Sequence, residues 1–317
     1  MGRFNNDLPQ LGGEIFLTDS GMETDLIFNK GFDLPFFASF TLLKNPKGRA
    51  AMRGYCLEHA LLAKRRGFGF IFESATWRAS PDWGVKLGLD KNALVAANRD
   101  AIALVEEVRD EAALETPFVI SGNVGPRGDG YKSGALMTVT EAEDYHSFQA
   151  EIFAHTAADL VTALTMNNTP EAIGFANAAA AAGMPCAISF TVETDGRLPS
   201  GQPLGEAIME TDFEARKQPA YYMINCAHPT HFTSVLMEGE HWLSRLRGLR
   251  ANASKCSHAE LDEAETLDDG NPGEFGLENA ALRRLVPSLT IFGGCCGTDL
   301  RHVEAIAAVL GQKKKVA

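Results

Sequence analysis

The sequence predicts an α/β fold, a closed (β/α)8 barrel that forms a single domain over residues 1–317, from three observations. Eight short apolar runs alternate with longer segments of helical period, a pattern typical of βα units and a parallel sheet. The runs are apolar almost throughout, as strands buried on both faces should be. The chain length suits one barrel, and no second domain is apparent. A doubly wound open sheet is the main alternative, because strand count alone does not show closure.

The eight candidate strands are runs rich in β-branched, aromatic and other apolar residues. In chain order they are Ile15–Asp19, Phe68–Ser74, Phe118–Gly122, Asp159–Leu164, Pro185–Thr191, Ala220–Cys226, Leu246–Asn252 and Thr290–Cys295. The seventh departs from the apolar pattern because it carries two arginines.

Helical segments are predicted between these strands. They are Lys47–Arg66, Lys91–Ala113, Thr140–Ala158, Pro170–Ala182, Thr230–Glu238, Glu278–Leu285 and Leu300–Leu310. Thr140 and Glu143 have the spacing of a capping box, and Thr169 places a cap before Pro170. The acidic, glycine-rich stretch Glu260–Phe275 has no periodicity, which predicts a long loop before the last two helices.

The charge balance narrows the classes of partner. The chain has 29 Lys and Arg against 41 Asp and Glu, a formal net charge of −12. Acidic residues spread along the chain repel nucleic acid and anionic membranes, so neither is an expected partner. The N-terminus is polar and no apolar run approaches the ~18 residues of a membrane span, so we expect a cytoplasmic protein. Six cysteines in such a chain are expected to stay reduced, which favours metal binding or catalysis over disulfides.

Two cysteine motifs stand at predicted strand ends. Cys295 and Cys296 lie between glycines where the last strand meets a helix, and Cys226 ends the sixth strand. In a barrel both ends lie on the face where active sites are built. Three thiolates converging there suit zinc and leave its fourth position open for a substrate thiol, which the metal keeps deprotonated. A redox-active pair, Cys295 with Cys296, is the competing interpretation.

Other candidate ligands have simpler interpretations. Cys56, Cys186 and Cys256 are expected to be small buried hydrophobic residues. His228 and His231 follow the sixth strand closely, but a surface or packing role is favoured over metal ligation. The glycines after the third strand lack the spacing of a dinucleotide-binding loop, so no nicotinamide site is expected.

The whole chain resembles the homocysteine S-methyltransferase family, which includes betaine- and S-methylmethionine-dependent enzymes and the homocysteine domain of methionine synthase. The matching motifs fall at predicted strand ends: Thr18–Thr24, Glu73–Ser80, Gly122–Pro126 and the two cysteine motifs. The resemblance implies a (β/α)8 barrel, Zn²⁺ bound by Cys226, Cys295 and Cys296, and a thiol methyl acceptor.

Further site residues follow from this resemblance. The acceptor is expected to be bound by residues at the ends of the first two strands: Asp19, Gly21, Glu73, Ser74, Thr76 and Trp77. Asn225 is expected to orient the cysteine after it, and Gly294 to let the backbone turn tightly at the metal.

Two positions depart from the family pattern. The usual Asp-Gly-Gly is Asp19-Ser20-Gly21 here. The fourth strand of the family commonly ends in Glu-Thr, with the Glu contacting the acceptor's amino group, whereas this chain has Leu164, which cannot accept a hydrogen bond through its side chain. Either another acid such as Glu73 or Glu193 takes this role, which we favour, or the acceptor is a thiol without a free α-ammonium.

The sequence therefore predicts a zinc-dependent S-methyltransferase that moves a methyl group from an onium or similar donor to a thiol, giving methionine if the acceptor is homocysteine. An onium donor carries its own leaving-group charge, so no general acid is required. Two alternatives belong to other classes: a zinc hydrolase or lyase on the same barrel, and a non-catalytic metal or redox sensor that uses the vicinal dithiol.

Overall fold

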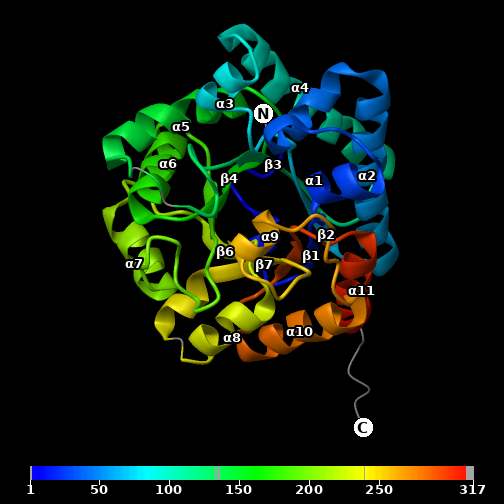
Figure 1. The fold of residues 1–317 in the computed structure, drawn as a ribbon, viewed down its shortest axis with the longest axis vertical. Helices are drawn as coiled ribbons and strands as arrows, with labels where there is room; N and C mark the ends of the chain where they lie inside the picture. The colour runs from blue at the N-terminus through cyan, green and yellow to red at the C-terminus, as the bar shows by residue number, and fades with distance from the viewer. Residues whose placement is uncertain (1, 133, 135, 239, 312–317) are drawn as a thin grey trace.

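Eight parallel strands close into a barrel in sequential order, in a computed structural model that describes residues 2–132, 134, 136–238 and 240–311 (Figure 1). The strands are β1 (Phe16–Leu17), β2 (Gly69–Glu73), β3 (Phe118–Val124), β4 (Leu160–Met166), β5 (Cys186–Phe190), β6 (Tyr221–Asn225), β7 (Leu246–Ala251) and β8 (Ile291–Gly294). Because β8 pairs with β1, the open-sheet alternative is wrong. All eight predicted strands are confirmed, with bounds that shift by one or two residues at most ends.

Helices ring the sheet, as Figure 1 shows. They are α1 (Met22–Thr24), α2 (Pro46–Arg66), α3 (Pro81–Lys86), α4 (Lys91–Ala112), α5 (Val139–Ala154), α6 (Thr169–Ala181), α7 (Leu204–Glu214), α8 (Pro229–Met237), α9 (His258–Asp262), α10 (Pro272–Leu285) and α11 (Leu300–Leu310). Shorter helical turns lie at Pro9–Leu11, Asp25–Asn29, Pro35–Phe37, Ser39–Lys44 and His241–Arg245. The seven predicted helices are confirmed, whereas α1, α3, α7 and α9 were not predicted. Helix α7 starts without a side-chain cap, so the usual start signal is missing.

The structure corrects three predicted helix boundaries. The capping box of α5 is formed by Thr138 and Glu141, two residues before the predicted pair. Asn168, not Thr169, caps α6 by accepting from a backbone N–H of the first turn. Helix α10 starts after an Asn271 cap, so the predicted loop is shortened at its C-terminal end as well as by α9.

Apolar side chains fill the closed end of the barrel. The interior cluster consists of Leu8, Phe16, Ile71, Val119, Leu160, Leu164, Ala187, Tyr221, Met223 and Ile291. A larger apolar layer packs the helices against the outside of the sheet. Polar and charged residues occupy the opposite, C-terminal end of the strands, which leaves that end available for a site. In the described part of the chain, no helix combines the length and apolarity that crossing a membrane requires.

Candidate active site

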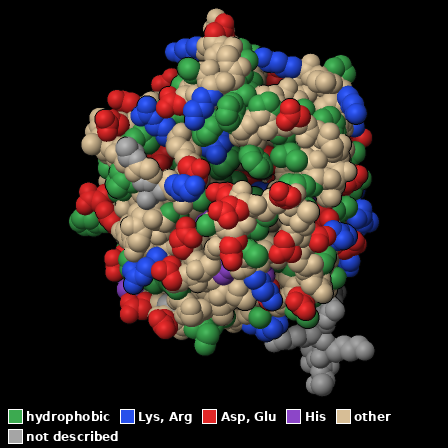
Figure 2. All heavy atoms as spheres, in the orientation of Figure 1, with side chains coloured by type: hydrophobic (Ala, Val, Ile, Leu, Met, Phe, Trp, Pro, Cys, Tyr) green, Lys and Arg blue, Asp and Glu red, His purple; other side chains and the backbone are tan. Residues whose placement is uncertain are grey.

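A cavity of about 380 Å³ opens at the C-terminal ends of the strands. Its walls come from the ends of every strand except β5, or from the loops that follow them. Figure 2 shows a hollow near the centre of the same face that Figure 1 presents, bordered by hydrophobic and acidic side chains. A cavity of this size, with converging polar groups at the active face of a barrel, is suited to a small-molecule ligand.

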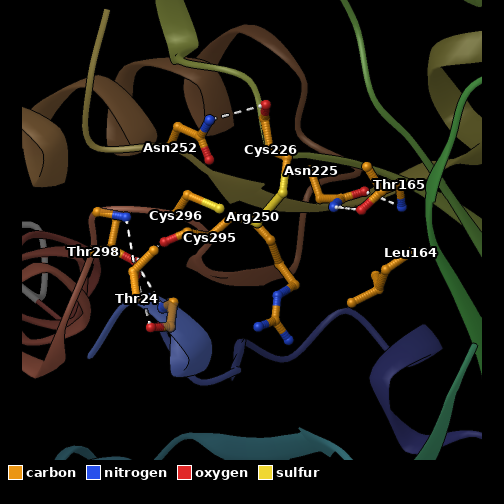
Figure 3. The surroundings of a disulfide bond; sticks show 12 residues. Thr24, Leu164, Thr165, Asn225, Cys226, Arg250, Asn252, Cys295, Cys296 and Thr298 are labelled. Carbon is orange, nitrogen blue, oxygen red and sulfur yellow. Dashed lines mark hydrogen bonds between the residues drawn. A yellow bond between two sulfur atoms is a disulfide. The ribbon is translucent and has the colours of Figure 1, made fainter. Parts of the chain in front are cut away.

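One wall of the cavity, here named the thiol wall, consists of Cys226, Cys295 and Cys296. Their three Sγ atoms lie within 4.8 Å of one another. Cys226 and Cys295 form a disulfide, and Cys296 is a free thiol (Figure 3). The expectation that all six cysteines are reduced is therefore wrong for this state of the molecule. The fold explains the pairing, because it brings the two strand ends close together.

The same three sulfurs fit a zinc ion once the disulfide is reduced. Sulfurs that share one tetrahedral zinc, at about 2.3 Å from the metal, lie about 3.8 Å apart. Reduction lets Cys226 and Cys295 separate towards that value, and Cys296 Sγ already lies within 4.8 Å of both. Three thiolates would leave one tetrahedral position free for a ligand, and all three cysteines line the cavity.

Backbone geometry fixes the position of the thiol wall. Cys226 lies just beyond β6 with φ of 55°, in the left-handed region. Its carbonyl oxygen accepts from Asn252 Nδ2 at 3.0 Å and from His258 Nε2 at 2.6 Å. A Cβ at Gly294 would collide with the Thr298 hydroxyl, so this turn requires glycine.

Asn225 holds a different residue from the one predicted. Its Oδ1 accepts from the Thr165 N–H at 2.9 Å, and its Nδ2 donates to Thr165 Oγ1 at 2.8 Å. The side chain therefore ties β6 to β4 across the cavity floor. Cys226 is oriented instead by Asn252 and His258, which the sequence analysis did not identify.

Tyr131 and His258 cover the thiol wall. The Tyr131 hydroxyl lies 3.7 Å from Cys296 Sγ, and its ring stacks on His258 with centroids 4.1 Å apart. Burial is the main reason that the pKa of the Cys296 thiol is raised. Neither residue belongs to a recognisable motif, so only the folded structure reveals them.

The opposite part of the cavity, here named the charged wall, consists of Asp19, Glu73 and Arg250. Arg250 Nη2 lies 2.7 Å from Asp19 Oδ1, and both side chains are buried. Burial raises the pKa of Glu73 to about 7, although the nearby Arg250 charge acts to lower it. The sequence analysis did not assign Arg250 to the site, and the only signal for it was the presence of two arginines in an otherwise apolar strand.

Most of the predicted acceptor residues line the cavity. These are Asp19, Gly21, Glu73, Ser74 and Trp77. Thr76 does not line it, because its hydroxyl is buried and donates to the Asn123 carbonyl at 2.7 Å. Glu193 lies outside the lining, with an oxygen 3.4 Å from His258 Nδ1. Leu164 lines the cavity as an apolar surface.

The remaining histidines and cysteines have structural roles. His228 caps α8 and His231 contacts the Lys255 carbonyl, so their packing roles are confirmed. Cys56 and Cys186 are buried as predicted. Cys256 is exposed, which contradicts the prediction, because it follows the end of β7 in an open loop.

Comparison with known proteins gives a consistent result. The family model for homocysteine S-methyltransferase matches residues 16–310. Homocysteine S-methyltransferase 2 of Arabidopsis thaliana is 23% identical over 207 residues, which are 62% of this chain and 61% of the relative. Selenocysteine Se-methyltransferase of Brassica oleracea var. italica is 23% identical over 200 residues, 60% of this chain and 57% of the relative. The chain thus spans about three fifths of the length of these curated relatives.

Solved structures agree with the barrel fold. The metallated form of the homocysteine methyltransferase MmuM from Escherichia coli aligns with a TM-score of 0.71 and 20% identity, covering 93% of this chain and 96% of that chain. Its oxidized form aligns with a TM-score of 0.72 and 21% identity, covering 94% and 96%.

Proposed function

The chain belongs to the homocysteine S-methyltransferase family, and from that membership we propose that it is a zinc-dependent enzyme that methylates a thiol of the homocysteine type. The observation that carries the proposal is the convergence of three cysteine sulfurs on the wall of a cavity that also holds buried charges. An onium compound is the proposed methyl donor, and methionine is the proposed product. Both substrates are small molecules, and we propose a cytoplasmic location.

The metal would be held by Cys226, Cys295 and Cys296. When bound, zinc lowers the pKa of a thiol at its open position, so that the acceptor is a thiolate near neutral pH. Reduction of the disulfide is a precondition, because a sulfur bonded to another sulfur is not a thiolate ligand.

The chain's own residues position the two substrates. The acceptor residues that we propose are Asp19, Gly21, Glu73, Ser74 and Trp77, since they line one cavity with the sulfurs. In the transfer, the acceptor sulfur forms a bond to the methyl carbon while the bond between that carbon and the donor's onium atom breaks, with its electron pair going to the donor. The cavity holds the two reactants close together and excludes most water, which is the main catalytic contribution expected of the protein.

The deciding experiment is a matrix of thiol acceptors against methyl donors, analysed by mass spectrometry with reduced, zinc-loaded protein. The donors include S-methylmethionine, a betaine and a methylated corrinoid. We expect a methyl thioether from homocysteine with at least one donor. Absence of methylated thiol in every combination contradicts the proposal, and the Cys226→Ser variant controls for uncatalysed transfer.

The disulfide joins Cys226 to Cys295 and not the adjacent pair Cys295 and Cys296, and it supports a second, redox-sensing function for the thiol wall. A sensor would cycle between the disulfide and the reduced thiols without methylating any acceptor. An enzyme that is stripped of metal and exposed to air should lose activity and recover it with reductant plus zinc. Reversible oxidation without turnover in the matrix favours the sensor.

A further inference from the structure

Arg250 presents hydrogen-bond donors that the protein does not use. The side chain is 5% exposed and lines the cavity. Nη2 faces Asp19 and donates to the Ser20 carbonyl at 3.3 Å. The Nε and Nη1 atoms have no hydrogen-bond partner among the described residues. Buried donors of a charged group are costly to leave unpaired, so they point to acceptor oxygens on a ligand.

Glu73 presents the complementary group. Its side chain ends β2, is 3% exposed and lies near the hydroxyls of Ser121 and Thr162, which act to lower its pKa. Oε2 is buried without a partner in the described structure. No ion pair of the described residues joins Glu73 to Arg250, although their charges interact through space. A carboxylate in this position is suited to a cation supplied by a ligand.

Charge balance on this wall selects among ligands. Asp19 and Arg250 neutralise each other, which leaves Glu73 as the uncompensated group. A zwitterion brings one cation for Glu73 and one anion for the unused donors of Arg250, and adds no net charge. A thiol acid without an amino group would add a second anion and leave Glu73 unpaired. The observations therefore favour an α-amino acid.

We propose that Glu73 and Arg250 together recognise the amino-acid end of the acceptor, with the ammonium at Glu73 and the carboxylate at Arg250. This inference rests on the proposed function and adds how this chain binds the acceptor. Leu164, on β4, packs against the acceptor's methylene groups. Figure 3 shows Arg250 extending away from the cysteines, with Leu164 beside it in this view. The acceptor's amino-acid end is thus held by residues of β2 and β7, in place of the usual Glu at the end of β4.

Binding of thioether probes to the reduced, zinc-loaded protein tests this arrangement without requiring methyl transfer. Calorimetry compares L-methionine with 4-(methylthio)butanoate, which lacks the ammonium, and 3-(methylthio)propylamine, which lacks the carboxylate. We expect the native protein to bind methionine at least about tenfold more tightly than either analogue, because each analogue loses a hydrogen-bonded charge pair.

Two variants separate the two contacts. Glu73→Gln keeps the shape of the side chain and removes its charge, so it should weaken methionine about ten- to hundredfold and leave the butanoate bound at least as tightly as in the native protein. Arg250→Lys keeps the charge opposite Asp19 but loses the planar fork, so it should weaken methionine and the butanoate and leave the amine unchanged. Glu206→Gln, an exposed position on α7 outside the cavity lining, is the matched control and should bind all three probes as the native protein does.

A pH series adds a readout that a structural role would not change. The titratable and charged groups that face Glu73 are Arg250 on β7, Asp19 just after β1 and Tyr221 on β6. Methionine affinity should fall as pH is lowered through about 7, because the Glu73 pKa lies there and a protonated carboxyl does not pair with ammonium. Glu73→Gln should show a flatter profile.

Three results overturn the inference: native protein that binds the butanoate as tightly as methionine, a Glu73→Gln variant that weakens all three probes equally, or an unchanged pH profile in that variant. The first would mean that an amino-free thiol acid is held by Arg250 alone. If the protein methylates homocysteine but binds the three probes with equal affinity, the inference is contradicted and the proposed function is not. If the three probes bind as expected but no combination of acceptor and donor gives a methylated thiol, the proposed function is contradicted instead.

Discussion

The thiol wall and the charged wall face one cavity but are encoded in different ways. Two of the three sulfurs are adjacent in the sequence, and all three close strands within short glycine- or asparagine-containing motifs. The charged wall takes Glu73 from β2, Arg250 from β7 and Asp19 from the segment just after β1, and no sequence motif indicates that these residues lie together. The proposed metal ligands are thus marked by short sequence motifs, whereas the residues proposed to recognise the substrate are not. We therefore expect substitutions in the thiol wall to lower activity more than substitutions in the charged wall.

The largest effect is expected at the thiol wall. Replacing Cys226, Cys295 or Cys296 with Ser should remove most of the zinc and lower kcat/KM by about 10³-fold or more. Each replacement removes one of the three protein ligands of the proposed metal. Zinc per chain and initial rates measure this. Cys56→Ala and Cys186→Ala, both outside the cavity, should retain metal. Full zinc content in Cys226→Ser would break the assignment of a cross-strand site.

The next effect concerns the charged wall and stability. The pKa of Glu73 in the folded chain is about 7, above its ordinary value of 4.5, so the folded state holds a proton in a range where the unfolded chain has released it. The free energy of unfolding should therefore fall by up to about 3 kcal/mol as pH rises from about 4.5 to about 7. Glu73→Gln should lack this component. Urea unfolding of both proteins at pH 5 and pH 8 measures it, and identical pH slopes would contradict it.

A smaller effect is expected at Leu164. Leu164→Glu adds a carboxylate to the β4 side of the cavity. It should lower the KM for homocysteine by up to about tenfold, the effect of one additional hydrogen bond worth about 1.4 kcal/mol. Zinc content should not change. An inactive variant that still holds its zinc and unfolds at the native temperature would indicate a different acceptor. Leu164→Gln, of similar size and without charge, is the control.

The smallest effect is expected from Tyr131→Phe. This change removes a hydroxyl that lies 3.7 Å from Cys296 Sγ and leaves the ring stacked on His258. A neutral hydrogen bond contributes roughly 0.5–1.5 kcal/mol, so kcat/KM should fall about two- to tenfold. Steady-state rates and chelator competition for zinc measure the change. A loss as large as that of a cysteine variant would mean that Tyr131 acts directly on a substrate.

The two walls also show what sequence reasoning can reach. The strands were predictable because most of them are nearly continuous apolar runs between polar segments, and strand ends in a barrel share one face. Cys226, Cys295 and Cys296 could be placed together for that reason. Arg250 could not be interpreted, because a charged residue in a strand gives no indication of which neighbour compensates it. Its partner, Asp19, is more than two hundred residues away and becomes adjacent only when β8 closes against β1.

Helix boundaries were less accurate for a local reason. Thr138 and Thr140 are each followed by an acid three positions later, so both fit a capping box. Only the backbone of the folded loop selects Thr138. The α7 helix lacks a capping side chain and was not found. Thr76 belongs to a motif at the cavity, yet its hydroxyl is used to hold the β3 backbone. A sequence motif therefore indicates which region of the chain lies at the cavity, but the direction in which each side chain points is known only from the structure.

The left-handed backbone at the floor of the cavity has a consequence for how the protein can change. Cys226 has φ of 55° and Thr165 has φ of 64°, and Asn225 joins the two strand ends on which they lie. Each such residue costs about 1–3 kcal/mol that glycine would avoid. Selection for thermal resistance alone would therefore favour glycine at both positions and erase a sulfur from the site. Retention of the two side chains through laboratory evolution would then depend on a growth requirement for the reaction itself.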